Sequence, residues 1–305
     1  MIPDFQTLML PFMQHIADGK EHSTTETLDS LVQQFKLTEE ELNQYLPSGN
    51  QRTFYNRVFW AKAHLKMAGL LENTKRRHFI ITDRGKQVLS TKPTAINLKF
   101  LKQFPEYIEN FLGKSKIDDK LNSVEKDNDT ESNATPEEIL ESNYLKVRKN
   151  LVLEILSKIK SSTPAFFENL VVELLVKMGY GGTIKEAGKS IGRSGDEGID
   201  GIIKEDRLGL DIIYIQAKRW EGVVGRPEIQ KFVGALAGQG AKKGVFITTS
   251  RFTNEAKEYQ PKNETKIVLI DGEQLADLMI DFNLAVTTTH TFTIKRIDND
   301  YFEEE

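Results

Sequence analysis

The 305-residue sequence contains no cysteine. Disulfides and thiolate zinc sites are therefore excluded, which suits a reducing compartment. No apolar run approaches the ~18 residues of a membrane-spanning helix. The amino terminus also lacks the basic start, apolar core and small-residue cleavage site of a secretion signal. We expect a cytoplasmic protein with no membrane partner.

The five histidines are spread along the chain without the spacing of metal ligands. We therefore expect neither a histidine metal site nor a histidine-based nucleophile. A nucleotide-binding loop is also excluded. Gly188-Lys189-Ser190 resembles the end of one, but Thr183 stands where the motif requires a glycine, and no helix pattern follows. We expect no ATP.

The charge is unevenly distributed along the chain, although the formal net charge is only −4. Residues 51–90 hold nine Lys or Arg against two acids, a local balance of +7, whereas residues 116–141 hold three against nine. The last eight residues add five acids. Base is thus concentrated in one folded segment, as expected of a face that contacts phosphates.

Residues 1–92 predict a small helical domain that ends in a hairpin. Helical spacing covers residues 5–16 and 25–35, Thr38 with Glu41 has the form of a capping box, and residues 53–68 form a further helix. Two short strands around residues 75–77 then predict the wing of a winged helix-turn-helix domain, which binds duplex DNA. A further helix over 96–112 would close the domain at residue 112.

The candidate DNA-binding residues are all basic and belong to that helix or to the wing. They are Arg52, Arg57, Lys62, Lys66, Lys75, Arg76 and Arg77. The alternative is a helical domain whose solvated basic face contacts a protein.

Residues 113–135 hold few large apolar side chains and cannot offset their own ordering entropy. We interpret them as a flexible acidic linker. Pro136 then opens a long helix to about Lys160, which begins the second domain, residues 136–305. That helix could dock on the second domain, pair with another subunit, or both. In the rest of the domain, predicted strands and helices alternate, which favours an α/β sheet with helices on both faces.

Candidate catalytic residues lie in this second domain. Asp200 stands at the head of one apolar segment, and Gln216 and Lys218 share one face of the next, because side chains alternate along a strand. A carboxylate, an amide oxygen and an ammonium would then converge as in a magnesium-dependent phosphodiesterase. The metal ligands expected are Asp200, Gln216 and Ala217. The alternative is that the three are a turn residue, a polar core group and a lysine at a strand end.

Glu168 is the fourth catalytic candidate. It lies at the edge of the apolar face of a helix that begins near Thr163, so its carboxylate could contact the metal through water or hold Lys218. A solvated acid near a helix N-terminus explains the same position. In the loop before Asp200, Lys185, Lys189 and Arg193 could meet phosphates, and Asp196 could be a second acid.

These residues carry a family resemblance. Asp200, Gln216-Ala217-Lys218 and Phe167-Glu168, with the flanking GYGG, GIDG, QAKRW, GRPE and GVFITTS, resemble the active-site region of Mrr-type restriction endonucleases, a branch of the PD-(D/E)xK superfamily. Gln216 replaces the commoner acid of the superfamily, as is usual in this branch. The resemblance covers most of residues 160–275, and the amino-terminal part resembles the Mrr N-terminal domain. It implies a central mixed sheet flanked by helices.

The leading hypothesis is a modification-dependent endonuclease that cuts foreign double-stranded DNA with Mg²⁺, or with Mn²⁺ in its place. The methyl dependence is implied only by the resemblance. The alternatives are a DNA-binding regulator with an inactive nuclease fold and a repair nuclease for branched or damaged DNA. Cutting both strands would favour a dimer or higher oligomer.

Overall fold

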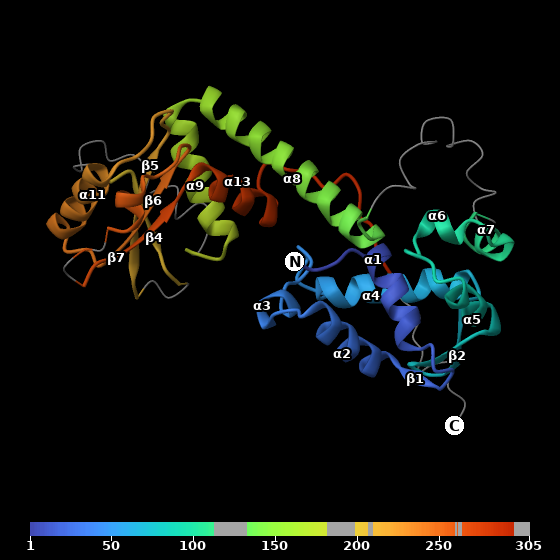
Figure 1. Cartoon of the computed structure of the whole chain (residues 1–305). Helices are drawn as coiled ribbons and strands as arrows, with labels where there is room; N and C mark the ends of the chain where they lie inside the picture. Colours follow the sequence, from blue (N-terminus) through green and yellow to red (C-terminus); the bar gives the residue numbers. More distant parts are fainter. Residues whose placement is uncertain (113–132, 182–198, 207–209, 260, 262–263, 296–305) are drawn as a thin grey trace. The chain divides into compact units, whose positions relative to one another are not determined.

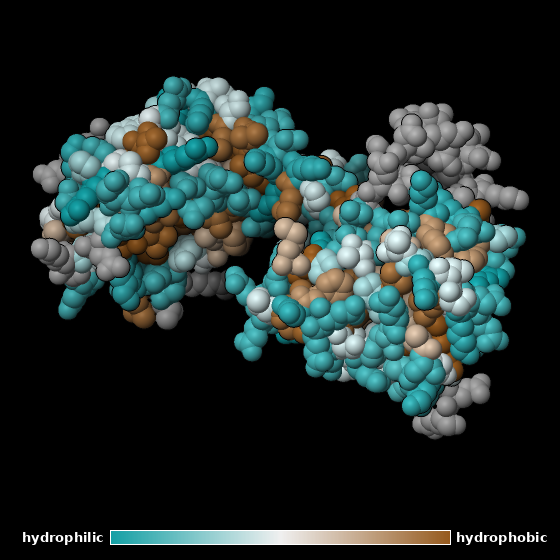
Figure 2. Space-filling view, viewed as in Figure 1, coloured by the Kyte–Doolittle hydropathy of each residue, from teal (hydrophilic) through white to brown (hydrophobic). Residues whose placement is uncertain are grey.

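The computed structural model describes the chain except for residues 113–132, 182–198, 207–209, 260, 262–263 and 296–305 (Figure 1). It forms two compact units, Met1–Val147 and Arg148–Glu305. Most of the predicted linker, and the loop residues Lys185, Lys189, Arg193 and Asp196, lie outside the described residues. In Figure 2 the visible surface of each unit is mostly hydrophilic, and the apolar patches are separate. No helix in the described ranges is long and apolar enough to cross a membrane.

The first unit is a winged helix extended by further helices. Its strands, β1 (His22–Ser23), β2 (Leu71–Lys75) and β3 (His78–Ile81), form an antiparallel sheet in the order β1-β3-β2. Its helices are α1 (Phe5–His15), α2 (Thr24–Phe35), α3 (Glu39–Leu42), α4 (Thr53–Met67), α5 (Asp83–Ser90), α6 (Leu98–Leu101) and α7 (Pro105–Leu112). A further helix begins in this unit and continues into the second. The helices predicted before residue 92, the hairpin and the wing are confirmed.

Short-range sequence signals set these boundaries. The side chain of Asp4 accepts hydrogen bonds from the first turn of α1, and the predicted capping box of Thr38 with Glu41 is confirmed at α3. The single helix predicted over 96–112 is wrong. It is broken into α6 and α7 at Pro105, which lacks the N–H that a continuous helix needs.

A glycine explains how α5 packs against β3 and α1. A Cβ at Gly85 would lie 2.2 Å from the carbonyl oxygen of Leu70, 2.6 Å from Cγ1 of Ile81 and 2.9 Å from Cε of Met13. No real side chain tolerates such contacts, so α5 can approach β3 only through a glycine. This accounts for the Thr-x-x-Gly pattern at Thr82, whose hydroxyl also accepts the N–H of Gly85.

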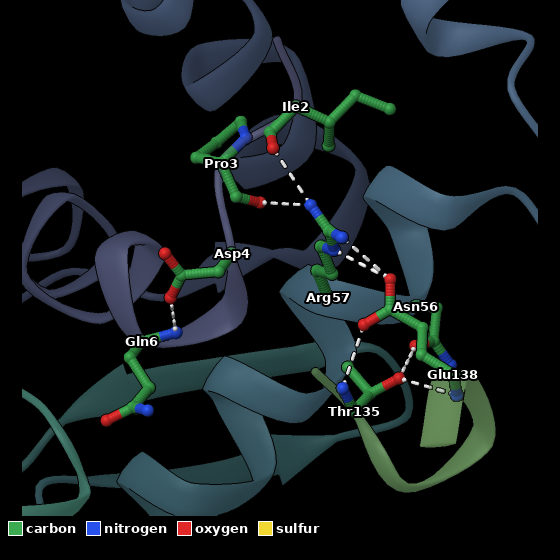
Figure 3. Close-up of polar contacts among 8 residues, drawn as sticks. All are labelled: Ile2, Pro3, Asp4, Gln6, Asn56, Arg57, Thr135 and Glu138. Carbon is green, nitrogen blue, oxygen red and sulfur yellow. Dashed lines mark hydrogen bonds and ion pairs between the residues drawn. The ribbon is translucent and has the colours of Figure 1, made fainter. Parts of the chain in front are cut away.

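Helix α8 (Pro136–Ser161) crosses the boundary between the units, and its beginning packs on α4 of the first (Figure 3). Thr135 and Glu138 satisfy each other's backbone N–H groups, which is the reciprocal bonding of a capping box. Thr135 is fully buried and donates to the side-chain oxygen of Asn56 at 2.6 Å. The last residues of the predicted linker are therefore part of the folded unit.

The second unit holds a mixed sheet between two helical layers. Its strands, β4 (Gly201–Lys204), β5 (Ile212–Lys218), β6 (Lys243–Thr248) and β7 (Lys266–Ile270), pair in chain order. Only β4 runs antiparallel to its neighbour. The helices are the rest of α8, α9 (Pro164–Lys177), α11 (Arg226–Gly238), α12 (Asn254–Lys257) and α13 (Gly272–Asp281).

Alternation along β5 and β6 divides the core of this unit. Ile213, Ile215 and Ala217 pack with residues of α8, α9 and α13 on one face of the sheet. Phe246 packs with residues of α11 and α12 on the other face. The sheet is thus covered on both sides, as predicted, and the end of β5 is fixed between two cores.

Candidate active site and nucleic-acid interface

Asp200 stands one residue before β4, where pairing with β5 fixes its position. Gly201 is opposite Ile215 in the antiparallel register, and the N–H of Asp200 donates to the carbonyl oxygen of Ile215 at 2.9 Å. The backbone N–H of Ala217 then donates to the Oδ2 atom of Asp200 at 2.7 Å. A charge-assisted hydrogen bond of this length holds the carboxylate at the end of the β4–β5 pair.

The same pairing orients the backbone of Ala217. The N–H and C=O groups of one strand residue point to the same neighbour, and those of the next residue point the other way. Since the Ala217 N–H points toward the β4 side, its carbonyl oxygen does so too, beyond the end of β4. A carboxylate and a peptide oxygen are thereby directed to the same edge of the sheet.

Gln216 and Lys218 are on the same face of β5, as predicted from their spacing. Gln216 is buried, with 6% of its surface exposed, and Lys218 is partly exposed. The carbonyl oxygen of Lys218 accepts from the hydroxyl of Thr248 at 2.9 Å. The backbone that carries the lysine is therefore anchored to β6.

Glu168 is in the second turn of α9, a helix capped by the Thr163 hydroxyl. Burial raises the pKa of the Glu168 carboxyl, the charge of Asp200 raises it further, and the charge of Lys218 acts in the opposite direction. Both charges are thus close enough to act on Glu168. Three of the four predicted catalytic residues therefore share one electrostatic environment.

The hydroxyl groups that follow β6 support this site, although the sequence reasoning gave them no role. The Thr249 hydroxyl donates to the carbonyl oxygen of Trp220 at 2.8 Å, and the Ser250 hydroxyl donates to that of Glu221 at 3.2 Å. Thr248, Thr249 and Ser250 are all buried. The run of hydroxyl residues in GVFITTS is the sequence signal, because buried hydroxyls require partners.

The exposed side of α4 is the candidate DNA surface of the winged helix. Lys66 is exposed, and the Arg52 guanidinium lies 5.8 and 5.6 Å from the ring centroids of Tyr45 and Tyr55. Phe59 has 46% of its surface exposed. The aromatic residues of this surface were not predicted, because the candidate DNA-binding residues were identified by their charge alone.

Arg57 differs from its predicted role, because its guanidinium is used inside the unit (Figure 3). It forms an ion pair with Glu138 at 2.8 Å and donates to the backbone oxygen atoms of Ile2 at 2.8 Å and Pro3 at 3.2 Å. The side chains of Arg57 and Glu138 are only 21% and 13% exposed. A phosphate would have to displace these partners, so we leave Arg57 out of the interface.

The ammonium group of Lys62 also contacts residues of its own unit. Its ammonium lies 4.2 Å from the ring centroid of Phe79 and donates to the Thr24 hydroxyl at 3.4 Å. Burial, with the charge of Lys66, lowers the pKa of Lys62 to about 8. Near that pH a DNA phosphate beside the ammonium would favour the charged form.

The wing presents the remaining basic residues. Arg76 and Arg77 are exposed and form the turn between β2 and β3. Lys75 is exposed too, and it pairs with Glu21 at 3.0 Å. Arg77 has a left-handed backbone, with φ of 59°, and its carbonyl oxygen accepts from the N–H of Thr24 at 2.8 Å. The wing tip is thus tied to the start of α2.

Comparison with known proteins defines the class. Residues 159–279 match the family model of a restriction endonuclease domain, and residues 5–91 match that of the Mrr N-terminal domain. The two matches fall on the two folded units and together cover most of the chain. The protein is a restriction endonuclease.

A whole-chain relative places it more closely. The chain is 33% identical over 316 residues to the type IV methyl-directed restriction enzyme EcoKMrr of Escherichia coli (strain K12), and the match covers 99% of each chain. The chain therefore belongs to the Mrr-type restriction endonucleases, and the resemblance drawn from its motifs is confirmed.

Two solved structures resemble parts of it. The MspJI restriction endonuclease in complex with a 27-mer oligonucleotide is 22% identical, with a TM-score of 0.33, over 43% of this chain and 31% of that one. The modification-dependent restriction endonuclease AspBHI is 18% identical, with a TM-score of 0.34, over 45% and 35% of the two chains.

The distinction between Arg57 and Arg52 is testable. Arg57→Ala leaves Glu138 partly buried without its cation, and we expect it to lower the free energy of unfolding by roughly 2 kcal/mol, below the ~3–5 of a fully buried pair. Arg52→Ala should leave stability nearly unchanged and weaken DNA binding, with a salt dependence shallower by about one unit if one phosphate contact is lost.

Denaturant unfolding and DNA titrations at several salt concentrations measure both effects. Lys66→Ala is the matched variant on the same exposed side of α4. If Arg57→Ala unfolds like the parent but its DNA binding depends less steeply on salt, the roles assigned to the two arginines are reversed.

Proposed function

We propose that this chain hydrolyses phosphodiester bonds of foreign double-stranded DNA that carries methylated bases, in the cytoplasm, with Mg²⁺ and without ATP. The observation that carries the proposal is the hydrogen bond from Ala217 to Asp200 at the end of the sheet, with Glu168 in the field of Asp200 and Lys218. The name of EcoKMrr, a methyl-directed enzyme, supports the choice of substrate.

The donor set fits a hard divalent ion. Asp200 offers a carboxylate oxygen, Gln216 an amide oxygen and Ala217 a peptide oxygen, and magnesium prefers such oxygen ligands. With only one charged ligand among the three, the ion would be held weakly until the DNA phosphate adds its own oxygen. Mn²⁺ fits the same set. The bound ion would stabilise negative charge on the phosphate and lower the pKa of a bound water.

The chain's own residues would perform the remaining steps. The Lys218 ammonium would orient the attacking water and neutralise charge that develops on the phosphate during in-line displacement. Glu168 would hold Lys218 and accept hydrogen bonds from water at the metal. The anchored backbone of Lys218 fixes the point from which its side chain extends toward the phosphate.

The winged helix would deliver this chemistry to its substrate. Basic residues of α4 and the wing, led by Arg52, Lys66 and Arg76, would contact the duplex backbone. The aromatic residues Tyr55 and Phe59 add apolar surface on the same helix, and an apolar side chain can contact a methyl group in the major groove. We propose that this pair contributes to recognition of the methylated base.

Substitutions in the second unit test the chemistry. Asp200→Asn should abolish cleavage, and Lys218→Ala should lower the cleavage rate by about 10²–10³-fold, since each removes charge stabilisation at the phosphate. Glu168→Gln should lower it by roughly 10–100-fold, as for a group that orients a metal site. Cleavage of plasmid DNA and binding with Ca²⁺ in place of Mg²⁺ are the measurements.

Glu173→Gln is the matched control, because Glu173 is on the same helix at a partly exposed position away from Asp200. It should cut like the parent, and all four variants should bind DNA normally. If Asp200→Asn still cuts DNA, or Glu173→Gln is as impaired as Glu168→Gln, the assignment fails.

The substrate is tested with plasmids that differ only in methylation. DNA from a methylating host should be cut and the same plasmid from a non-methylating host should persist. Equal cutting of both would favour a nuclease for damaged or branched DNA, and retardation of both with no cutting would favour a DNA-binding regulator.

We further propose that the chain acts as a dimer, because one site of this kind cuts one strand. Its support is an apolar stripe on α8, where Leu140, Tyr144 and Val147 recur at helical spacing and are 47%, 59% and 67% exposed.

Val147→Glu should shift sedimentation of the full chain from dimer to monomer, whereas Ser142→Glu should not. A monomeric parent at micromolar concentration would exclude this dimer.

A further inference from the structure

The end of α1 and strand β1 bring two histidines together, although the spacing of the histidines in the sequence predicts no metal site. The ring centroids of His15 and His22 are 4.9 Å apart, at an angle of 61°. The chain reverses between them at Gly19, whose φ of 75° favours glycine. A spacing of seven residues gives no signal of this contact, because the turn creates it.

One ring nitrogen of each histidine in this pair is buried without a hydrogen-bond partner. His22 is buried, with 7% of its surface exposed, and its Nε2 atom lies 2.7 Å from Oδ1 of Asp18. The Asp18 carboxylate can only accept, so Nε2 of His22 carries a hydrogen, and in the neutral ring the lone pair is on Nδ1. That Nδ1 atom and Nε2 of His15 are both buried without a partner. Such groups cost stability unless something binds them.

A carboxylate completes the cluster. Glu26, in the first turn of α2, places its Oε1 atom 3.5 Å from Nδ1 of His22. One donor atom from each of His15, His22 and Glu26 lies within 4.8 Å of the other two. Electron-rich atoms that converge in this way repel one another unless a cation lies between them.

We propose that His15, His22 and Glu26 bind a divalent transition-metal ion of the zinc type. Two imidazoles and one carboxylate are a common ligand set for zinc, whereas magnesium rarely takes imidazole. Water would occupy a fourth position. The site is in the winged helix, is separate from the nuclease residues, and does not rest on the proposed function.

The geometry needs little adjustment. Metal–ligand bonds of about 2.1 Å in a tetrahedral site place ligand atoms about 3.4 Å apart, which the Glu26–His22 pair already matches. Glu26 has a side chain 58% exposed, so it is free to adjust its position toward His15.

Asp18 would act as the outer partner of the site. Histidines that bind metals usually donate their other ring N–H to a carboxylate, which fixes the ring and strengthens the ligand. The hydrogen bond from His22 to Asp18 has this arrangement. The ion would join α1, β1 and α2, and β1 pairs with β3 of the wing through His22 opposite Phe79. Metal binding would therefore stabilise the part of the winged helix that supports the wing.

The experiment uses the full chain with Asp200→Asn in the background and millimolar Mg²⁺ present, so that the nuclease site does not contribute. Titration with ZnCl₂ at neutral pH should raise the unfolding temperature of the first unit by about 5 °C or more once zinc is well above its dissociation constant. Co²⁺ should give visible absorption bands of an imidazole-bound ion, and dialysed protein should retain about one zinc per chain.

Glu26→Gln removes one ligand at an exposed position, and Asp29→Asn removes the same charge from the same helix three residues later. Glu26→Gln should weaken zinc binding at least about tenfold and lose the Co²⁺ bands, whereas Asp29→Asn should bind like the parent. Asp18→Asn should weaken binding about 10–100-fold while keeping the bands.

Two outcomes would overturn the proposal. In one, zinc neither raises the unfolding temperature nor produces Co²⁺ bands in the parent, which would leave a proton as the cation between these groups. In the other, Glu26→Gln binds zinc as tightly as Asp29→Asn, which would place the ion elsewhere on the chain.

Discussion

The hydrogen bond from the Ala217 backbone to the Asp200 carboxylate is the contact on which the candidate active site depends. It exists only because β4 and β5 pair with Gly201 opposite Ile215. A register shift of one residue would turn Ala217 away and reverse the faces of Gln216 and Lys218. The burial of Ile213 and Ile215 against α9 and α13 opposes such a shift. Packing of the sheet thereby specifies the geometry of the candidate catalytic residues.

The same site stores unfavourable electrostatic energy. Glu168 and Asp200 are two acids in one partly buried environment, and the pKa of Glu168 is raised by burial and by its neighbour. A divalent ion would relieve this repulsion, and Lys218 relieves part of it in the free protein. Functional sites commonly retain such conflict because the groups are arranged for the charges of the reaction.

Most of the fold, and the proximity of the candidate site residues to one another, could be predicted because their signals are local. Periodicity and capping residues identify α4 and the strands, and Asp200 and Lys218 are placed by alternation within two neighbouring strands. The use of Arg57 and Lys62 could not be predicted, since it depends on Glu138 and Phe79, which are distant in sequence. The pairing of His15 with His22 was missed for a related reason, because a turn brings them together and no periodic pattern records it. Pro105 is a local signal that the helix over 96–112 is divided, but the apolar spacing on both sides of it suggested one continuous helix.

Acidic residues within the first unit reduce the positive charge that this unit exposes. From the sequence, residues 51–90 carry an excess of base and residues 116–141 an excess of acid, which suggests a basic domain followed by an acidic linker. In the structure, the first turns of α8 return to the basic domain: Glu138 pairs with Arg57, Glu137 accepts from the indole N–H of Trp60, and Glu141 accepts from Ser48. Part of the positive charge is therefore neutralised within the fold. We expect DNA to contact Arg52, Lys66 and the wing tip, so the position of the charge, more than its total, would determine how duplex DNA binds.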